Sequence, residues 1–157
     1  MKLSVIIPVY NEEKRLSACI NSLLKSLSKY DFKFEVIISA DGCMDRTVKI
    51  AENFAETFPQ VKVTSFHERL GKGGGILNAL KVATGDVVII TDVDLSTPPE
   101  QIPKIMAIME KEGADIVFGS RNLPNSVIQV KPPIHRKILG KVFNFLFRLL
   151  FGIKLYD

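Results

Sequence analysis

The chain has 157 residues, of which 46% are hydrophobic and 24% are charged, and its formal net charge at pH 7 is +4. This length suits one domain, and the apolar content, without any low-complexity segment, excludes an intrinsically disordered chain. The two cysteines form no Cys-x-x-Cys pair, which excludes a cysteine-based metal motif and favours reduced thiols in a cytosolic protein.

The basic charge is concentrated at the C-terminal end. Residues 131–157 hold six of the 21 Lys and Arg residues and one acid, Asp157, whereas the first 130 residues are nearly neutral. This distribution predicts an anionic partner for the C-terminal segment, either a membrane or a nucleic acid.

Strand and helix patterns alternate from residue 3 to residue 119. Continuous apolar runs predict buried strands at residues 3–9, 34–39, 61–66, 87–90 and 115–119. Apolar residues at three-to-four spacing predict helices between them, the first opened by Asn11 as N-cap with Glu12 and Glu13 in its first turn, and the second capped by Asp45. A further helix is expected over residues 99–111. This order predicts an α/β fold with a mostly parallel, Rossmann-like sheet covered by helices on both faces.

Four glycines and Lys72 make up residues 71–75, after the third strand. Glycine lets the backbone approach another group closely, and the helix expected from Ile76 would point its amino end at this loop. With Lys72 as a point charge, the segment could bind an anion. It matches neither the P-loop nor the Gly-x-Gly-x-x-Gly pattern, and a flexible turn without a ligand is the alternative.

Two carboxylates, Asp92 and Asp94, directly follow the fourth expected strand. Open α/β sheets place their ligands at the carboxyl ends of their strands, and hard oxygen ligands suit Mg²⁺ or Mn²⁺. Both acids can address one ligand only if the strand ends there and the backbone turns. The alternative is a strand that ends in two solvated acids.

A helix is expected from Ile134 to Phe151, after a surface loop over residues 122–133. Apolar residues cover most of this helix, and its polar stripe consists of Lys137, Lys141, Asn144 and Arg148. Charges in the middle of the apolar run argue against a transmembrane span, so an interfacial helix in the headgroup region fits better. The alternative is a helix buried against the domain or in a dimer.

Four stretches together resemble glycosyltransferase family 2, because both their order and their spacing agree with it. They are SVIIPVYNEE at residues 4–13, ADGCMDRT at 40–47, GKGG at 71–74 and DVDLS at 92–96. Within that family, FGSR at 118–121 and the basic apolar segment 136–157 resemble the polyprenyl-phosphate branch, which contains the dolichyl-phosphate mannose and glucose synthases.

The resemblance implies a GT-A fold and an inverting transfer of a hexose from a nucleotide sugar, such as GDP-mannose or UDP-glucose, to a polyprenyl or dolichyl phosphate. Mg²⁺ or Mn²⁺ is the implied cofactor. Residues 1–133 would form the nucleotide-sugar-binding domain, and residues 134–157 would begin an acceptor and membrane-interface region at the cytoplasmic face of the membrane. The protein is therefore expected to be a peripheral membrane protein on the cytoplasmic side.

Two other functions stay open. One is a family 2 transferase that acts on a sugar hydroxyl, and the other is a non-catalytic domain that binds a nucleotide sugar or an anionic membrane. Nucleic acid is not expected as a partner, because Phe and Leu dominate the basic C-terminal segment and polar side chains that read bases are sparse.

The resemblance assigns the donor site residue by residue. Pro8, Tyr10 and Glu12 match positions that line the nucleotide pocket, and Asp41 matches the acid that reads the base. Lys72 joins this nucleotide-sugar-binding set as the cation of the glycine-rich segment.

The remaining roles concern the metal and the acceptor. Asp92 and Asp94 match the pair that holds metal and diphosphate, and Ser96 occupies a further metal-proximal position. Arg121 matches a basic residue near the acceptor phosphate, with Arg136 assisting it. The expected catalytic residues are therefore Asp92, Asp94 and Arg121.

The sequence departs from the family pattern in three places. Ala40 stands where many relatives have another Asp, and Gly75, Leu77 and Ala79 replace the Ala, Arg and Gly that often follow Gly-Lys-Gly. The sequence stops at Asp157, where relatives continue into more of the acceptor lobe, so an incomplete acceptor half is expected.

Overall fold

The computed structural model describes residues 1–120 and 134–152, without the side chains of residues 134–138 and 141. The chain divides into two units, residues 1–113 and residues 114–157. The loop expected over residues 122–133 lies outside the described residues.

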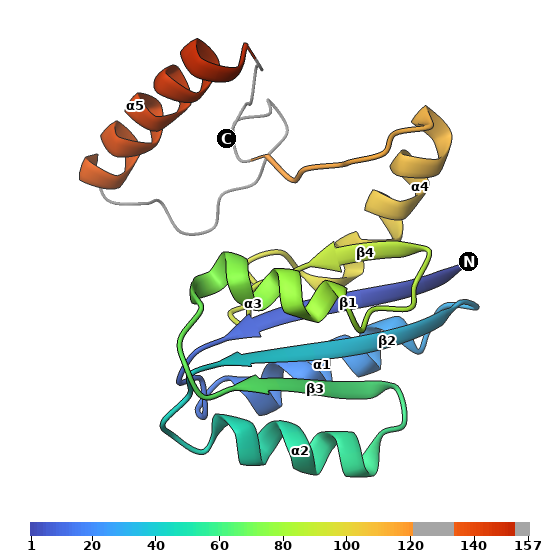
Figure 1. Ribbon diagram of the computed structural model, residues 1–157. Coiled ribbons are helices and arrows are strands. Elements are labelled where there is room, and N and C mark those ends of the chain that lie inside the picture. The colour runs from blue at the N-terminus through green and yellow to red at the C-terminus, as the bar shows by residue number, and fades with distance from the viewer. Residues whose placement is uncertain (121–133, 153–157) are drawn as a thin grey trace. The chain divides into compact units, whose positions relative to one another are not determined.

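In the described part of the first unit, four parallel strands form one sheet in the order β3-β2-β1-β4 (Figure 1). The strands are β1 (Lys2–Val9), β2 (Lys33–Asp41), β3 (Val61–Phe66) and β4 (Val87–Ile90). The chain runs outward from β1 to β3 and then returns to the other side of β1. The strand order therefore reverses between β1 and β4, and a parallel α/β sheet binds ligands at the carboxyl ends of its strands near such a point.

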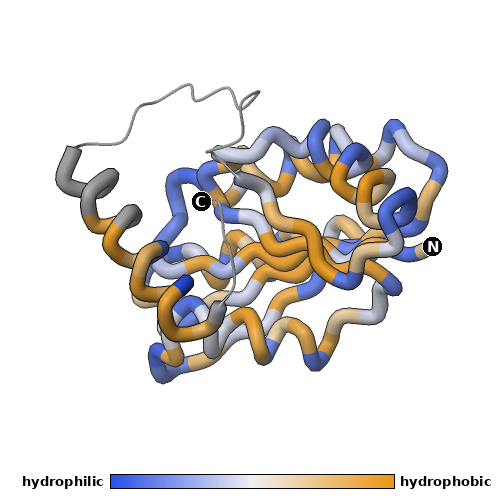
Figure 2. The backbone as a smooth tube through the Cα atoms, turned by 90° about the horizontal axis from the view of Figure 1, so that it is seen from above, coloured by the Kyte–Doolittle hydropathy of each residue, from blue (hydrophilic) through white to orange (hydrophobic). Residues whose placement is uncertain are grey.

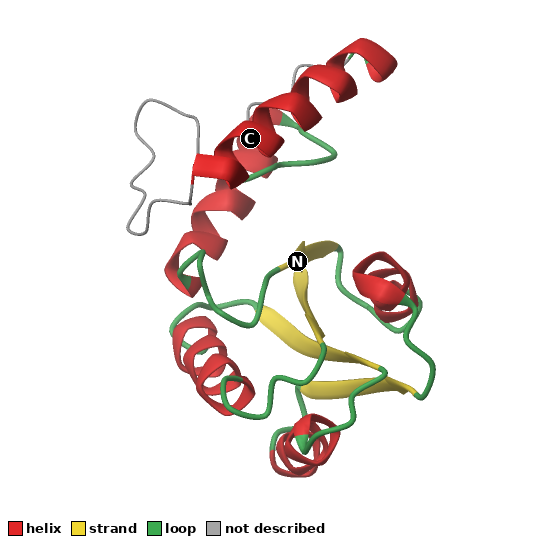
Figure 3. Ribbon diagram, turned by 90° about the vertical axis from the view of Figure 1, so that its left-hand side faces the viewer, coloured by secondary structure: helices red, strands yellow, loops and turns green. Residues whose placement is uncertain are grey.

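Helices cover both faces of this sheet, as predicted (Figure 3). Alternate residues of β1 explain the two layers, since successive side chains point to opposite faces. Val5 and Ile7 pack in the larger core with α1 (Leu16–Leu27) and α2 (Thr47–Thr57), whereas Ile6 packs in a smaller core with Ala79 of α3 (Gly71–Leu80). Figure 2 shows these apolar strands at the centre of the first unit.

A short 3-10 helix, η1 (Pro99–Gln101), leads into α4 (Ile102–Glu112). Met106 is 5% exposed and belongs to the larger core, as expected for a packing residue. Gly113 ends α4 in the left-handed conformation, with φ of +59°. Cys19 and Cys43 are both free, and burial, with a smaller contribution from nearby acids, raises the pKa of Cys19 to about 12.

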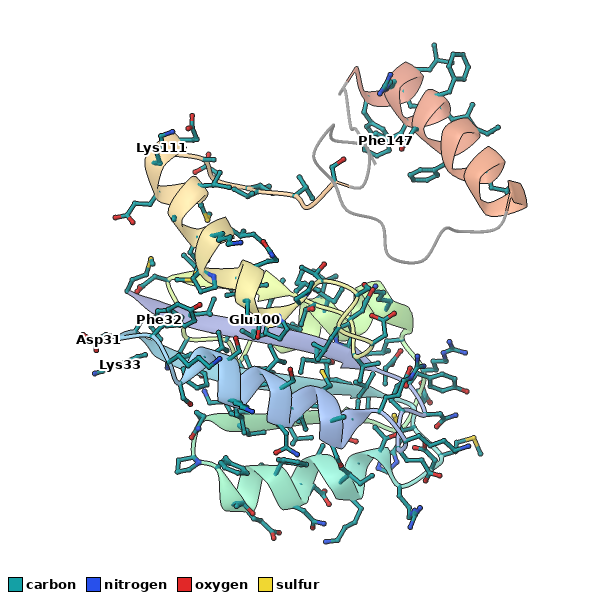
Figure 4. All side chains as sticks on the ribbon, turned by 180° about the vertical axis from the view of Figure 1, so that it is seen from behind. Asp31, Phe32, Lys33, Glu100, Lys111 and Phe147 are labelled. Atoms are coloured by element: carbon teal, nitrogen blue, oxygen red, sulfur yellow. The ribbon has the colours of Figure 1, made fainter. Side chains whose placement is uncertain are left out.

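The amino ends of the strands are joined by one buried carboxylate, Glu35, which is 2% exposed. It accepts hydrogen bonds from Ser4 Oγ at 2.6 Å and from the backbone N–H of Thr84 at 2.7 Å, and it pairs with Lys62 Nζ at 2.7 Å. Gly85 donates to Ser4 Oγ at 2.9 Å, and a Cβ at Gly85 would lie 2.6 Å from the backbone nitrogen of Ser4. At this end of the sheet, near Lys33 in Figure 4, there is therefore no room for a side chain at Gly85.

The strand predicted for residues 115–119 is absent, because none of these described residues belongs to a strand. Ile116 and Phe118 are 69% and 71% exposed. An apolar run indicates a preference for burial, but a strand also requires a neighbour whose backbone groups pair with its own.

The prediction that Asn11 caps the first helix is also wrong. Helix α1 begins at Leu16 and has no acid in its first turn. Asn11 has a φ of +52°, and its Oδ1 accepts a hydrogen bond from the backbone N–H of Met44 at 2.8 Å. Asn11 thus joins two loops instead of starting a helix.

The glycine-rich segment differs from its prediction in a similar way. Residues 71–75 are not a loop before a helix but the first part of α3 itself. The N-cap of α2 is Arg46 and not Asp45 as predicted, although Asp45 Oδ1 accepts the backbone N–H of Thr47, the first residue of α2, at 2.9 Å.

The second unit contains α5 (Ile134–Phe151), with the predicted bounds. Eight of its apolar side chains are between 48% and 74% exposed: Leu139, Val142, Phe143, Phe145, Leu146, Leu149, Leu150 and Phe151. Phe147, labelled in Figure 4, has its ring centroid 4.6 Å from that of Phe151, as four-residue spacing on a helix allows. Within the described residues, no helix combines the length and the apolarity that a membrane span requires.

Candidate functional site

A cavity of about 350 Å³ opens at the carboxyl ends of β1, β2 and β4. Its lining includes every residue that the sequence assigns to the nucleotide sugar or to the metal, except Ser96. These residues are Pro8, Tyr10, Glu12, Asp41, Lys72, Asp92 and Asp94. Arg15 and Arg69 also line it, and sequence reasoning missed both. Ala40, one of the departures from the family pattern, is fully buried in the larger core and does not line the cavity.

Tyr10 and Arg69 form one wall of the cavity. The guanidinium carbon of Arg69 lies 3.8 Å from the centroid of the Tyr10 ring, which is a cation–π contact. Gly42 has a φ of +65°, and a Cβ at this position would lie 3.1 Å from the Cβ of Arg69. The position of Arg69 therefore depends on a glycine at the end of β2.

Asp41 ends β2 and is 5% exposed. Its Oδ1 accepts a hydrogen bond from the backbone N–H of Leu70 at 2.6 Å, so the carboxylate is held at the start of α3. Ser39 Oγ donates to the carbonyl oxygen of Gly75 at 2.9 Å, and a Cβ at Gly75 would lie 3.3 Å from Ser39 Oγ. The glycine that departs from the family pattern at position 75 thus allows α3 to pack closely against β2.

Glu12 is engaged within its own loop. Arg15 donates from Nε and Nη2 to the two oxygens of Glu12, each at 2.8 Å. The backbone N–H of Glu12 donates to Thr47 Oγ1 at 2.7 Å, which joins this loop to the start of α2. Glu12 and Arg15 thus present an ion pair to the cavity.

The chain turns sharply after β4, which is the condition for both acids to face one ligand. Thr91 still donates to the carbonyl oxygen of Ile6 at 3.0 Å, but Leu95 has a φ of +51° and its N–H reaches back to the carbonyl oxygen of Asp92 at 3.2 Å. Asp92 and Asp94 consequently line the same cavity.

Each of the two carboxylates has a partner. Asp92 Oδ1 lies 2.6 Å from Lys72 Nζ, in an ion pair between α3 and the loop after β4. Asp94 Oδ1 accepts the backbone N–H of Ser96 at 2.9 Å. The described contact of Ser96 therefore supports Asp94, and Ser96 itself is not among the residues that line the cavity.

The carboxylates of Asp92 and Asp94 suit a divalent cation that also binds oxygens of a ligand. Asp92 and Asp94 supply hard carboxylate oxygens at one wall, as Mg²⁺ and Mn²⁺ prefer. Among the described side chains, no three His, Cys, Asp or Glu residues gather as a metal site. A cation held here would thus need oxygens from a bound ligand as well.

The acceptor residues expected from the sequence cannot be placed in the same way. Arg121 lies outside the described residues, and Arg136 belongs to α5 without a described side chain. Arg15 did have a signal in the sequence, because it stands three residues after Glu12, whereas the contact of Arg69 with Tyr10 joins residues far apart in the sequence.

Comparison with known proteins gives the family. The pattern of the family described as "Glycosyl transferase family 2" matches residues 4–156. The dolichol-phosphate mannosyltransferase of Pyrococcus furiosus is 34% identical over 141 residues, which cover 90% of this chain and 39% of the relative. The undecaprenyl-phosphate 4-deoxy-4-formamido-L-arabinose transferase of Proteus mirabilis is 37% identical over 121 residues, or 76% of this chain and 36% of the relative.

Solved structures of similar fold include two complexes with nucleotide sugars. S. aureus TarS 1-349 with UDP-GlcNAc has a TM-score of 0.61 and 30% identity, covering 83% of this chain and 37% of that one. The mannosyltransferase PcManGT from Pyrobaculum calidifontis, with GDP-Man and Mn²⁺, has a TM-score of 0.53 and 30% identity, covering 68% and 32%.

These matches confirm the predicted GT-A fold. The chain spans about two fifths or less of the length of these relatives. The family pattern extends over nearly all of the sequence, including all the residues that line the cavity. The chain therefore belongs to glycosyl transferase family 2.

Proposed function

We propose that the protein transfers a hexose, with inversion, from a nucleotide sugar to a polyprenyl phosphate, and that residues 1–113 bind the donor. The observation that carries the proposal is the meeting of Asp41, Lys72, Asp92 and Asp94 in one cavity where the strand order reverses. The relatives named for dolichol-phosphate and undecaprenyl-phosphate transfer support the choice of acceptor.

The cavity has the size and chemistry for a nucleoside diphosphate. Its volume of about 350 Å³ falls in the range of about 300–1,000 Å³ that ligand pockets have. Tyr10 with Arg69 offers a flat surface for a base, and the oxygen of Asp41 that does not bind Leu70 can accept an N–H from it. Lys72 supplies positive charge for a diphosphate.

Asp92 and Asp94 are the residues that would hold a divalent cation, Mg²⁺ or Mn²⁺. A bound divalent cation stabilises the charge that develops on a departing diphosphate. The Mn²⁺ and GDP-Man in the similar Pyrobaculum mannosyltransferase support this assignment.

In the proposed reaction, an oxygen of the acceptor phosphate attacks the anomeric carbon, and the bond from that carbon to the diphosphate oxygen breaks on the opposite side. A phosphate is already ionised at neutral pH, so the protein needs no strong general base. The protein contributes orientation instead, with Arg121 and Arg136 assigned to the acceptor phosphate.

The location proposed for the protein is the cytoplasmic face of a membrane, with α5 lying in the headgroup region. The exposed apolar residues of α5 and the six basic residues in 131–157 match an anionic lipid surface. Flotation with vesicles that contain anionic lipid, compared with and without residues 134–157, tests this. Equal flotation of both forms would show that α5 does not bind the membrane.

A donor screen tests the function as a whole. Radiolabelled GDP-mannose, UDP-glucose and UDP-GlcNAc are each incubated with polyprenyl phosphate, Mn²⁺ and the protein, and label is followed into the organic phase. We expect one donor to label the lipid. Label that enters only an added glycan would instead support transfer to a sugar hydroxyl, and donor binding without any transfer would support a non-catalytic domain.

A further inference from the structure

Lys72 and Asp92 belong to different elements and meet at the cavity. Lys72 is the second residue of α3, and Asp92 is the second residue after β4. Their side chains are 62% and 51% exposed, while Nζ and Oδ1 are 2.6 Å apart. Because water competes for both charges, an exposed pair of this kind contributes little and a stronger ligand can displace it.

The helix around Lys72 is fixed, although the ammonium group is not. The backbone of Leu70, two residues earlier, is hydrogen-bonded to Asp41, and the carbonyl of Gly75, three residues later, accepts from Ser39. Any displacement of the ammonium therefore occurs along its flexible four-carbon stem, without movement of α3.

A divalent cation and the Lys72 ammonium would compete for Asp92. Two cations at one carboxylate repel each other, so a divalent cation that enters alone binds against the positive charge of the ammonium. The other acids that line the cavity are already engaged: Glu12 by Arg15, Asp41 by Leu70, and Asp94 by the N–H of Ser96. A diphosphate supplies the anion that an expelled ammonium needs.

We propose that Lys72 couples the binding of the divalent cation to the binding of the nucleoside diphosphate. It neutralises Asp92 while the donor is absent, and it moves to the diphosphate when the cation takes its place at Asp92. This inference rests on the proposed function, from which it takes the two ligands. Because such coupling is reciprocal, each ligand must tighten the binding of the other by the same factor.

The experiment titrates Mn²⁺ into the whole chain without nucleotide and with saturating GDP or UDP, and it follows free Mn²⁺ by electron paramagnetic resonance. The variants are Lys72→Met, which removes the charge, and Lys72→Arg, which keeps it. Lys81→Met is the matched control, because Lys81 lies at the other end of α3 and bonds Asn78 at 2.8 Å.

For the natural chain, we expect the nucleotide to tighten Mn²⁺ binding at least about tenfold. Lys72→Met should tighten nucleotide-free Mn²⁺ binding by about threefold to fivefold, as the loss of a weak competing pair implies. Lys72→Met should also reduce the factor by which the nucleotide tightens Mn²⁺ binding. Lys72→Arg should keep most of the coupling, and Lys81→Met should behave as the natural chain does.

Unchanged or weaker nucleotide-free Mn²⁺ binding in Lys72→Met would overturn the inference, while Mn²⁺-dependent nucleotide binding by the natural chain would leave the proposed function intact. If neither the natural chain nor any variant binds Mn²⁺ with nucleotide present, the metal assignment and the inference both fail.

Discussion

Asp41 Oδ1 accepts a hydrogen bond from the backbone N–H of Leu70, with 2.6 Å between oxygen and nitrogen, and this bond connects the end of β2 to the start of α3. Asp41 therefore has two tasks, since one of its oxygens organises the protein while the residue also lines the cavity that we assign to the nucleotide.

Substitutions at Asp41 separate these tasks. Asp41→Asn keeps an acceptor oxygen for Leu70, so we expect stability within about 1 kcal/mol of the natural chain but nucleotide binding at least about tenfold weaker. Asp41→Ala removes the acceptor and should also lower the free energy of unfolding by about 1–3 kcal/mol. Urea denaturation and calorimetry with GDP and UDP measure both effects. Asp31→Asn, at an exposed acid, is the control, and natural affinity in Asp41→Asn would refute the base-reading role.

Asp94→Ala should abolish the metal-dependent part of nucleotide binding, because it removes one of the two carboxylates assigned to the cation. Calorimetry with GDP or UDP should show similar weak binding by the variant with and without Mn²⁺. Glu110→Gln on α4, at an exposed acid, controls for the change in net charge. If the variant kept the full affinity in Mn²⁺, the role of Asp94 would be wrong.

Glu35 should make stability depend on pH in the acid range. Burial raises the pKa of this carboxyl, but hydrogen bonds from Lys62, Ser4 and Thr84 outweigh burial and lower it from 4.5 to about 2. A depressed pKa stabilises the fold above pH 4.5, and this contribution is lost as the pH falls toward 2. A shift of this size corresponds to about 3 kcal/mol.

Glu35→Gln should therefore lower the free energy of unfolding by up to about 3 kcal/mol at pH 7, since it removes this charge. The difference from the natural chain should shrink between pH 4.5 and pH 2, as measured by urea denaturation at several pH values. A difference that is the same at pH 7 and at pH 2.5 would indicate lost packing instead of lost charge.

Two neighbouring glycines of α3 should respond differently to alanine. A Cβ at Gly73 meets nothing within 4 Å, so Gly73→Ala should stabilise the protein by about 0.5–1 kcal/mol through helix propensity. A Cβ at Gly74 would lie 2.6 Å from the Cβ of Leu70, so Gly74→Ala should gain less or destabilise. Thermal unfolding of the two variants, each serving as the control for the other, should give the higher melting temperature for Gly73→Ala. Equal melting temperatures would contradict the prediction.

Strands and layers could be predicted from the sequence because their signals are local. The burial predicted for β4 is wrong, since Val88 and Ile90 of this edge strand are 36% and 49% exposed. In β1, continuous apolar residues predicted a strand buried on both faces, and Val5 and Ile6 do pack in different cores. The family pattern likewise assigned the donor residues, which the structure brings together in one cavity.

The failures come from partners that are distant in the sequence. Asn11 has a good N-cap side chain, but its amide oxygen binds Met44, 33 residues away, and no local pattern reports that bond. Arg69 escaped prediction because its place against Tyr10 depends on the backbone at Gly42. Residues 115–119 have strand composition, but composition does not specify a pairing partner.

The contrast between the two ends of the sheet has a consequence for evolution. Around Glu35, almost any substitution would leave a buried charge or hydroxyl without its partner, and Gly85 tolerates no side chain. Lys72 and Asp92, at the other end, are more than half exposed and contribute little to folding. A substitution of Lys72 or Asp92 can therefore alter ligand binding while the fold is kept, whereas a substitution around Glu35 threatens the fold before it reaches the cavity.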